Sequence, residues 1–274
     1  MSRFLKNFKN LKYPLHCENC EGISDVENPR HHPSYEITLE CNLDCIFCYS
    51  RIARERPFKK GYYGDMDPKV ITISQFGEPL LVGEKEIVRI VRELRNIFGN
   101  VRLDLQTNGI LLTEKICENF DIVMISLNAG SKERYFQIKK RDFFETVVEK
   151  IKMSSKITHT IVRTIFIPGI NDDELPKIAE IANSADEFFL QPISVYIKNK
   201  ELLEKLDLVR TESIAEFLKF ALKLLDIAPT RIPGCFLLNL KRVLKDIEFE
   251  DLKFLKRDVF AEFPEIRRDW RFKI

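Results

Sequence analysis

The sequence predicts an α/β fold built on a parallel sheet. From residue 34 onward, short β-branched apolar runs alternate with stretches of helical period, which is typical of βα units. Each apolar run is followed by a turn with polar residues or glycine. Because ligands bind at the carboxyl ends of strands in parallel sheets, these turns are expected to converge on one site. The six expected strands are residues 34–40, 70–76, 101–106, 122–128, 158–167 and 186–193.

Amphipathic helices are expected between and after these strands. Residues 84–98 place their apolar side chains on one stripe, and the helix is expected to end at Gly99. Asp142 followed by Glu145 has the spacing of a capping box, so a second helix should begin there. A third helix is expected after Thr211, where apolar residues again repeat at helical spacing.

Composition and charge limit the classes of function. With 274 residues, of which 45% are hydrophobic, the chain can bury a substantial core. Its 44 Lys and Arg nearly balance 42 Asp and Glu, so the net charge of +2 does not indicate nucleic acid binding. No apolar run reaches the roughly 18 residues of a membrane span, and the N-terminus has no apolar h-region, so a cytoplasmic protein is expected.

Seven cysteines make metal or redox chemistry the central question. Five of them fall within residues 17–48, and in a reducing compartment such clustering indicates metal or redox chemistry more than disulfides. In the segment CNLDCIFC, Cys41, Cys45 and Cys48 stand at intervals of four and three. A compact loop with these intervals can wrap three thiolates around a 4Fe–4S cluster and leave one iron without a protein ligand.

A structural zinc site is the alternative interpretation. Cys17-x-x-Cys20 and Cys45-x-x-Cys48 together would supply four thiolates, a common zinc pattern. This pairing leaves Cys41 without a role, and a zinc ribbon does not normally begin a long series of βα units. The spacing therefore favours the cluster, and a nonenzymatic zinc or iron–sulfur binding module remains the alternative function.

The segment CNLDCIFC resembles the CxxxCxΦC signature of the radical S-adenosylmethionine (SAM) superfamily. The resemblance implies that Phe47 is the aromatic residue that lies near the adenine. ISQFGEP, at the end of the second expected strand, resembles the family's GGEP motif, with Phe76 where the first glycine usually stands. It implies that Gly77 and Glu78 bind the SAM amino group. The resemblance covers roughly residues 34–195.

Later segments resemble the same superfamily in the same order. LQTNG and ISLNAG, at the third and fourth strands, imply that Thr107, Asn108 and Ser126 contact the ribose and carboxylate of SAM. IFIPGIND and LQPI resemble the segments at the ends of the fifth and sixth strands. Each of these later segments is a weak signal by itself, since Asn-Gly and Pro-Gly are ordinary turn formers.

The resemblance implies a partial (β/α)6 TIM-like barrel of the radical SAM type, with extensions at both ends. The expected parts are an N-terminal extension at 1–33 that carries Cys17-x-x-Cys20, the core barrel at 34–195 and a helical C-terminal extension at 196–274. Cys41, Cys45 and Cys48 would hold the 4Fe–4S cluster.

The implied activity is reductive cleavage of SAM to a 5′-deoxyadenosyl radical, which abstracts hydrogen from a substrate. The overall reaction stays open between cofactor biosynthesis, methylation and glycyl-radical activation, and no catalytic residue is assigned. The implied partners are a reductant such as flavodoxin or ferredoxin and a small-molecule or protein substrate.

Three features fall outside these motifs. His16, Cys17, Cys20, His31 and His32 are interpreted as a zinc site, part of a second cluster with Cys235, a redox pair or a structural group. Cys117 is expected in the core. The basic and aromatic segment 51–69 is either a solvated crossover or a docking surface for an acidic electron donor or a phosphorylated substrate. The tail RRDWRFKI is expected to pack on the mouth of the barrel.

Overall fold

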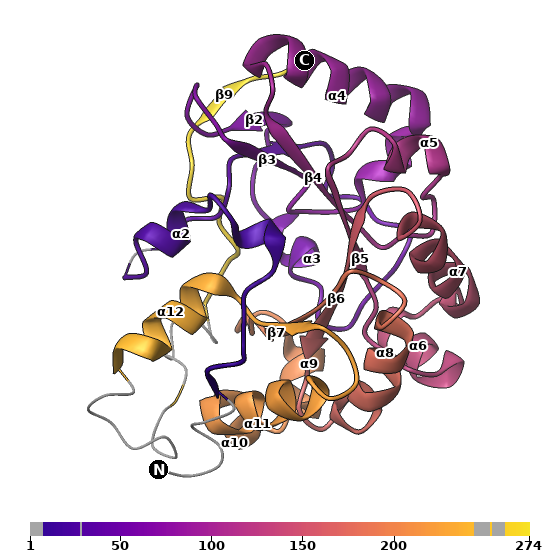
Figure 1. Ribbon diagram of the computed structural model, residues 1–274, viewed down its shortest axis with the longest axis vertical. Coiled ribbons are helices and arrows are strands. Elements are labelled where there is room, and N and C mark those ends of the chain that lie inside the picture. Colours follow the sequence, from indigo (N-terminus) through magenta and orange to yellow (C-terminus); the bar gives the residue numbers. More distant parts are fainter. Residues whose placement is uncertain (1–7, 28, 244–252, 254–260) are drawn as a thin grey trace.

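Figure 1 shows the computed structural model of the chain, which describes residues 8–27, 29–243, 253 and 261–274. Within these residues, nine strands form one sheet in the order β8-β7-β6-β5-β4-β3-β1-β2-β9. Neighbouring strands from β1 and β3 through β8 are parallel, whereas β2 and β9 are added antiparallel at one edge. The strands are β1 (Ser34–Glu36), β2 (Gly61–Tyr63), β3 (Val70–Ile73), β4 (Arg102–Thr107), β5 (Ile122–Ser126), β6 (His159–Phe166), β7 (Glu187–Pro192), β8 (Thr230–Arg231) and β9 (Trp270–Phe272).

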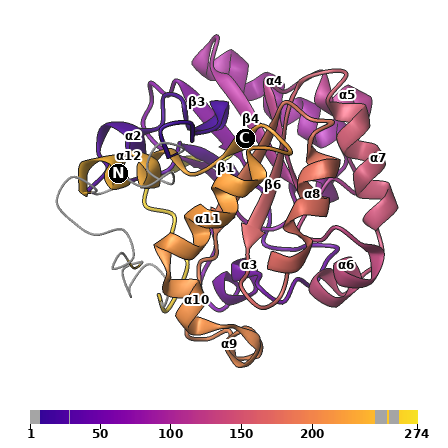
Figure 2. The same cartoon turned by 60° about the horizontal axis from the view of Figure 1, so that its bottom comes forward.

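The six predicted strands are confirmed as β1 and β3 to β7. Each crossover from β3 to β7 places the next strand beside the previous one, so the sheet grows in chain order and stays open at both edges. Figure 2 shows helices along one side of this curved sheet, as expected for a partial (β/α)6 barrel. These helices are α4 (Glu84–Phe98), α5 (Glu114–Cys117), α6 (Lys132–Lys139), α7 (Phe144–Ser154), α8 (Leu175–Ala182) and α11 (Ile214–Leu224).

Shorter helices lie in the connections and extensions. In the described residues, the α-helices are α2 (Glu21–Ser24), α3 (Tyr49–Ala53), α9 (Lys200–Lys205), α10 (Leu208–Glu212) and α12 (Gly234–Val243). The 3-10 turns are η1 (Leu15–Cys17), η2 (Pro79–Val82) and η3 (Asp172–Glu174). No helix in the described part of the chain is both long enough and apolar enough to cross a membrane.

The predicted helix ends are partly confirmed. Gly99 ends α4 with a φ of 69°, a conformation that glycine adopts without strain. The capping box at Asp142 is wrong: Phe143 is the N-cap of α7 without a side-chain cap, and Asp142 bonds to a lysine of α6 instead. The helix expected after Thr211 is confirmed as α11; Thr211 itself belongs to α10, and the hydroxyl of Ser213 accepts the capping hydrogen bond of α11.

The C-terminal region 196–274 is not only helical. It contributes α9 to α12 and also β8 and β9, which extend the sheet at its two opposite edges. Residues Trp270–Phe272 of the tail therefore lie along β2 at the edge of the sheet. Trp270 Nε1 donates to the Lys60 carbonyl at 3.0 Å, and the Lys59 ammonium lies 2.9 Å from the Trp270 ring centroid. Sequence periodicity missed these strands because they are two or three residues long.

The basic segment 51–69 forms α3, β2 and their connections, and its arginines have acidic partners. Because these ion pairs neutralise much of its positive charge, the solvated crossover is the better-supported interpretation. Docking of an acidic electron donor on this segment stays a prediction. The ion pairs are Arg51–Asp44 at 2.8 Å, Arg54–Glu40 at 3.4 Å and Arg56–Glu265 at 3.7 Å.

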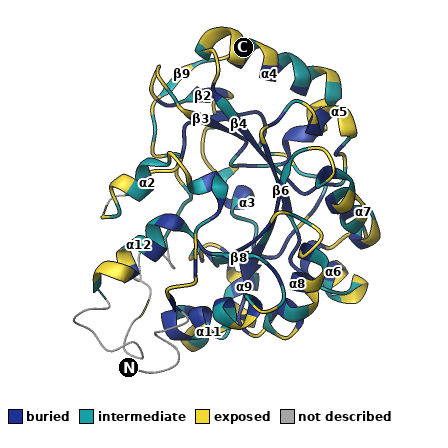
Figure 3. Ribbon diagram, in the orientation of Figure 1, coloured by how far each residue is buried: buried dark blue, intermediate teal, exposed yellow. Residues whose placement is uncertain are grey.

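The sheet has two different faces. Figure 3 shows that the strands are mostly buried and that the helices expose only their outer surfaces. On the helix side, the main core contains Leu105, Val123 and Val162. Residues one position along on the same strands, such as Gln106 and Arg163, face the opposite side and line a cavity. Alternation along each strand thus separates the core from the cavity.

A buried ion-pair network fixes the N-terminal extension to β4. Asp104, which is completely buried, accepts from Arg102 at 3.0 Å and from His16 Nδ1 at 2.7 Å. Arg102 also donates to the carbonyls of His16 and Glu18. His16, His32 and Asp104 bring potential metal ligands within 4.8 Å of one another. Because Arg102 already neutralises Asp104, this group is better explained as a structural anchor.

Asp104→Asn is expected to lower the free energy of unfolding by about 3 kcal/mol, because the substitution leaves a largely buried Arg102 without its counter-charge. Urea unfolding followed by circular dichroism measures this loss. Glu201→Gln is the matched control, since the exposed pair of Glu201 with Lys205 should contribute little. Equal effects of the two substitutions would contradict the anchoring role.

Candidate active site

The three cysteines of the CNLDCIFC loop follow β1 and are held against helix α6. The backbone N–H groups of Asp44 and Ile46 donate to the carbonyls of Lys139 and Ile138 at 3.1 and 3.0 Å. The amide of Asn199 donates to the Ile46 carbonyl at 2.8 Å. Because these contacts fix the loop backbone on both sides of Cys45, the cysteines are positioned by the fold and not only by their own spacing.

The sulfur atoms lie in a largely buried setting with nearby hydrogen-bond donors. The N–H of Leu43 and the amide of Asn108 lie 3.4 and 3.7 Å from the Cys41 sulfur. Burial raises the pKa of Cys41, and it raises the pKa of Cys45 to about 12. Burial favours the neutral thiol over the thiolate. Thiolates in this setting would therefore need the positive charge of a bound metal centre.

Lys139 is a site residue that the sequence did not reveal. It is the last residue of α6 and only 2% exposed, and its ammonium lies 5.1 Å from the Phe47 ring centroid. Its charge lowers the pKa values of Cys45 and Glu78, opposing the effect of burial on both. A lysine within a charged helix carries no sequence signal for this position, because only the docking of the cysteine loop on α6 buries it.

Glu78 connects the ends of β3 and β4. One carboxylate oxygen accepts from the Thr107 hydroxyl at 2.8 Å and from the Leu80 N–H at 3.1 Å, and the other accepts from the Asn108 N–H at 2.7 Å. Burial raises the pKa of Glu78 to about 7, against the effect of these hydrogen bonds. The structure therefore brings together three residues that the sequence proposed as SAM contacts. A carboxylate accepts about four hydrogen bonds, so Glu78 retains room for one more donor.

Gly77 is required by the close approach of two loops. Its φ is +64°, and a Cβ atom there would lie 2.2 Å from the Thr38 carbonyl oxygen. Its N–H donates to the Ser50 hydroxyl at 3.1 Å. The preceding turn is held by Glu36, a second missed residue, whose buried carboxylate accepts from the Ser74 hydroxyl at 2.8 Å and from two backbone N–H groups. The strand pattern marked Glu36 only as one position of β1.

Phe47 and Ser126 belong to two other parts of the candidate site, the cysteine loop and the end of β5. Phe47 is buried and lines the cavity beside the cysteine loop. Ser126 ends β5, where its hydroxyl accepts from the amide of Asn128 at 3.1 Å. Since Thr107 pairs with Ile125, Ser126 follows one register position later on the neighbouring strand. The structure thus places all the predicted site residues at the carboxyl ends of β1, β3, β4 and β5.

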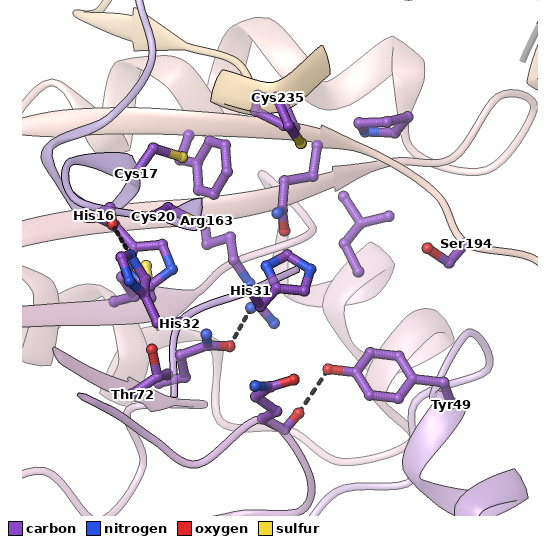
Figure 4. Close-up of a pocket in the computed structure, with 18 of the residues that line it drawn as sticks. His16, Cys17, Cys20, His31, His32, Tyr49, Thr72, Arg163, Ser194 and Cys235 are labelled. Atoms are coloured by element: carbon purple, nitrogen blue, oxygen red, sulfur yellow. Dashed lines mark hydrogen bonds between the residues drawn. The ribbon is translucent and has the colours of Figure 1, made fainter. Parts of the chain in front are cut away.

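A cavity of about 230 Å³ lies on the inner face of the sheet (Figure 4). Its walls include Phe47 and Tyr49 beside the cysteine loop. Arg163 reaches into it from β6 and donates to the amide oxygen of Gln106. Because Gln106 is neutral, this hydrogen bond does not cancel the guanidinium charge. The cavity thus contains a cationic group that suits an anionic ligand.

The sequence profile of the Radical SAM superfamily matches residues 35–182. The chain belongs to this superfamily. The matched range contains the cysteine loop, the Glu78 turn and the ends of β4 and β5. Members of the radical SAM superfamily use a 4Fe–4S cluster and SAM, so this chain is an enzyme of radical SAM chemistry. The alternative of a nonenzymatic binding module is wrong.

Relatives of this radical SAM enzyme differ in how much of their length it matches. An uncharacterized protein of Methanocaldococcus jannaschii is 41% identical over 278 residues, covering 96% of this chain and 93% of that protein. A probable GTP 3′,8-cyclase of Pyrococcus abyssi is 28% identical and covers 59% of this chain and 55% of the cyclase. The tRNA 4-demethylwyosine synthase of M. jannaschii is 29% identical, and the match covers 72% of this chain and 64% of the synthase. The enzyme thus spans just over half of the cyclase and less than two thirds of the synthase.

Among solved structures, SuiB of Streptococcus suis bound to S-adenosylmethionine has a TM-score of 0.51 to this radical SAM enzyme. The two chains are 12% identical, and the match covers 73% of this chain and 49% of SuiB. At this identity the likeness shows the fold alone. It agrees with the partial barrel described above.

The structure does not assemble the zinc site that Cys17, Cys20, Cys45 and Cys48 would form. A single zinc ion holds its thiolates about 3.8 Å apart, given Zn–S bonds of about 2.3 Å. Among the described residues of this radical SAM enzyme, no three cysteine sulfurs lie within 4.8 Å of one another. Cys17 and Cys20 instead line the cavity together with Cys235.

Proposed function

We propose that Cys41, Cys45 and Cys48 hold a 4Fe–4S cluster and that the enzyme cleaves SAM reductively to a 5′-deoxyadenosyl radical. The observation that carries this proposal is the cysteine loop, which hydrogen bonds hold in place. Asn108 connects this loop to Glu78, because its side-chain amide contacts the Cys41 sulfur and its backbone N–H donates to the Glu78 carboxylate. A cluster with three thiolate ligands has one iron free for another ligand. When bound, it supplies one electron to SAM, and cleavage of the S–C5′ bond gives methionine and the radical that abstracts hydrogen.

The protein's part in this reaction is to bind and orient SAM. We assign the SAM amino group to the free hydrogen-bonding position of Glu78 and to the backbone at Gly77, because a buried carboxylate binds an ammonium group strongly. Thr107 holds Glu78 in place, and Asn108 connects that carboxylate to the Cys41 sulfur. Phe47 would pack against the adenine, and Ser126 would contact the ribose or carboxylate.

The cavity suggests the class of substrate. Arg163 and the neutral amides around it favour a small substrate, or a single group of a larger one, that carries negative charge. The names of the partial relatives refer to GTP and to tRNA, both of which are anionic. Hydrogen abstraction from such a compound is compatible with cofactor biosynthesis or methylation, whereas glycyl-radical activation would need a protein segment to enter the cavity. A flavodoxin or ferredoxin would supply the electron.

Anaerobic reconstitution with iron and sulfide tests the proposal. With dithionite and SAM, the protein should release deoxyadenosine and methionine in equal amounts, and SAM should change the electron paramagnetic resonance (EPR) spectrum of the reduced cluster. A deuterium-labelled substrate should transfer its label into deoxyadenosine. Stoichiometric zinc in the anaerobically purified protein, with no deoxyadenosine after reduction, would contradict the proposal.

A further inference from the structure

Three cysteines outside the CNLDCIFC loop meet at the wall of the cavity. Cys17 ends the turn η1 and Cys20 is the N-cap of helix α2, whereas Cys235 is the second residue of α12. All three line the cavity that also contains Phe47 and Tyr49. Figure 4 shows Cys17 and Cys235 on one side of this cavity and Tyr49 and Ser194 on the other. Only folding brings Cys235 to a pair of cysteines so distant in the chain.

Two glycines allow the segments that carry these cysteines to approach closely. A methyl group on Gly234 would lie 3.2 Å from Cβ of Cys17, and one on Gly22 would lie 3.5 Å from Cβ of Cys235. Helices α2 and α12 therefore lie side by side, as Figure 1 also shows. Burial raises the pKa of Cys17, and the nearby Cys20 and Cys235 raise it further. The three cysteines are only partly buried where they line the cavity, so packing in the core does not account for them.

Backbone hydrogen bonding opposes the effect of burial on the pKa values of the three thiols. Burial raises the pKa of all three thiols, and backbone hydrogen bonding from Gly234 lowers the pKa of Cys17, from Gly22 and His32 that of Cys20, and from Phe236 that of Cys235. Hydrogen bonds of this kind stabilise thiolate charge and tune iron–sulfur clusters. The Cys41 sulfur of the first loop has the same kind of partner in the N–H of Leu43.

The spacing of the sulfurs indicates what they could hold. They are too far apart to form a group within 4.8 Å, as are the sulfurs of Cys41, Cys45 and Cys48. A single zinc ion needs its thiolates about 3.8 Å apart. A cluster of several irons is larger and bridges more widely spaced thiolates. Cys17, Cys20 and Cys235, here called the second triad, thus resemble the first triad of Cys41, Cys45 and Cys48 in that their sulfurs are spaced too widely for a single zinc ion.

We propose that Cys17, Cys20 and Cys235 hold a second iron–sulfur cluster at the wall of the cavity. Three thiolates leave one iron of a 4Fe–4S cluster without a cysteine ligand. That iron would face the cavity that Arg163 and His31 also line, where a nitrogen or oxygen donor could reach it. This cluster goes beyond the proposed cleavage of SAM, and its presence does not depend on that activity.

Iron content in two triple variants tests the second site. After reconstitution with iron and sulfide, the wild-type protein should hold about eight irons per chain, and each of two variants should hold about four. One variant replaces Cys41, Cys45 and Cys48 with alanine, and the other replaces Cys17, Cys20 and Cys235. The first variant should still show the EPR spectrum of a reduced cluster, unchanged by SAM. The second should keep the SAM-dependent spectrum.

Cys117→Ala is the control, because this buried cysteine belongs to neither triad. It should keep about eight irons. If the triple variant fails to fold, the single substitution Cys235→Ser is used in its place. Circular dichroism shows whether each variant is folded. A wild-type protein with about four irons, all lost with Cys41, Cys45 and Cys48, would overturn the proposal. So would stoichiometric zinc bound by the second triad, or a disulfide between Cys17 and Cys20 that persists in the anaerobically reduced protein.

Discussion

Replacing Cys41, Cys45 and Cys48 together with alanine is expected to lower deoxyadenosine formation at least roughly 100-fold, because the cluster that delivers the electron loses every thiolate that holds it. Deoxyadenosine and methionine are measured by chromatography after anaerobic incubation with SAM and dithionite. The same variant should lose the change that SAM causes in the EPR spectrum.

Cys117→Ala is the matched control for this prediction. Cys117 is completely buried in the core and packs among apolar side chains away from the cysteine loop. Its replacement should leave deoxyadenosine formation unchanged and lower the free energy of unfolding only slightly. A triple variant that still produces deoxyadenosine at the wild-type rate would show that another set of residues holds the reducing centre.

Gly77→Ala is expected to lower the free energy of unfolding by about 3–5 kcal/mol and to weaken SAM binding more than tenfold. The added methyl group would lie 2.2 Å from the Thr38 carbonyl and 2.8 Å from that of Glu40, so backbone would have to move. That movement would shift Glu78, whose N–H donates to the Glu40 carbonyl at 2.8 Å. Urea unfolding and calorimetric titration with SAM measure the two effects.

Gly83→Ala separates backbone strain from the steric clash. Gly83 also has a positive φ, of +88°, but a methyl group there has nothing within 4 Å. This control should therefore cost only the backbone strain of a conformation that is nearly restricted to glycine, about 1–3 kcal/mol, and leave SAM binding unchanged. If the two substitutions were equally destabilising and neither affected SAM binding, Gly77 would be an ordinary turn residue.

Much of the fold was predictable because the local pattern and the tertiary environment agree. In α4, the apolar stripe faces the sheet and Gly99 ends the helix. The spacing of the apolar residues and the glycine were therefore enough to predict this helix and its end. Helix caps were less predictable, since Asp142 had the right spacing but bonded to Lys132 on another helix. Strands β2, β8 and β9 were missed because their pairing partners, not their two or three residues, define them.

Some residues of the candidate site were also predictable from local sequence, whereas others were not. The spacing of Cys41, Cys45 and Cys48 and the GEP turn lie in short local segments, so the sequence displayed them directly. Lys139 and Glu36 carried no such signal. Each acts through a contact with a distant loop: Lys139 lies beneath the cysteine loop, and Glu36 holds the turn before Gly77.

The sequence by itself determined the parallel α/β pattern, the cysteine loop and the order of the motifs along the chain, because each depends on residues only a few positions apart. Only the tertiary structure decided that Cys235 joins Cys17 and Cys20, that Arg163 points into the same cavity and that the tail completes the sheet edge. These relations join residues far apart in sequence. They follow from how α2, α12 and the strands pack, which local spacing does not record.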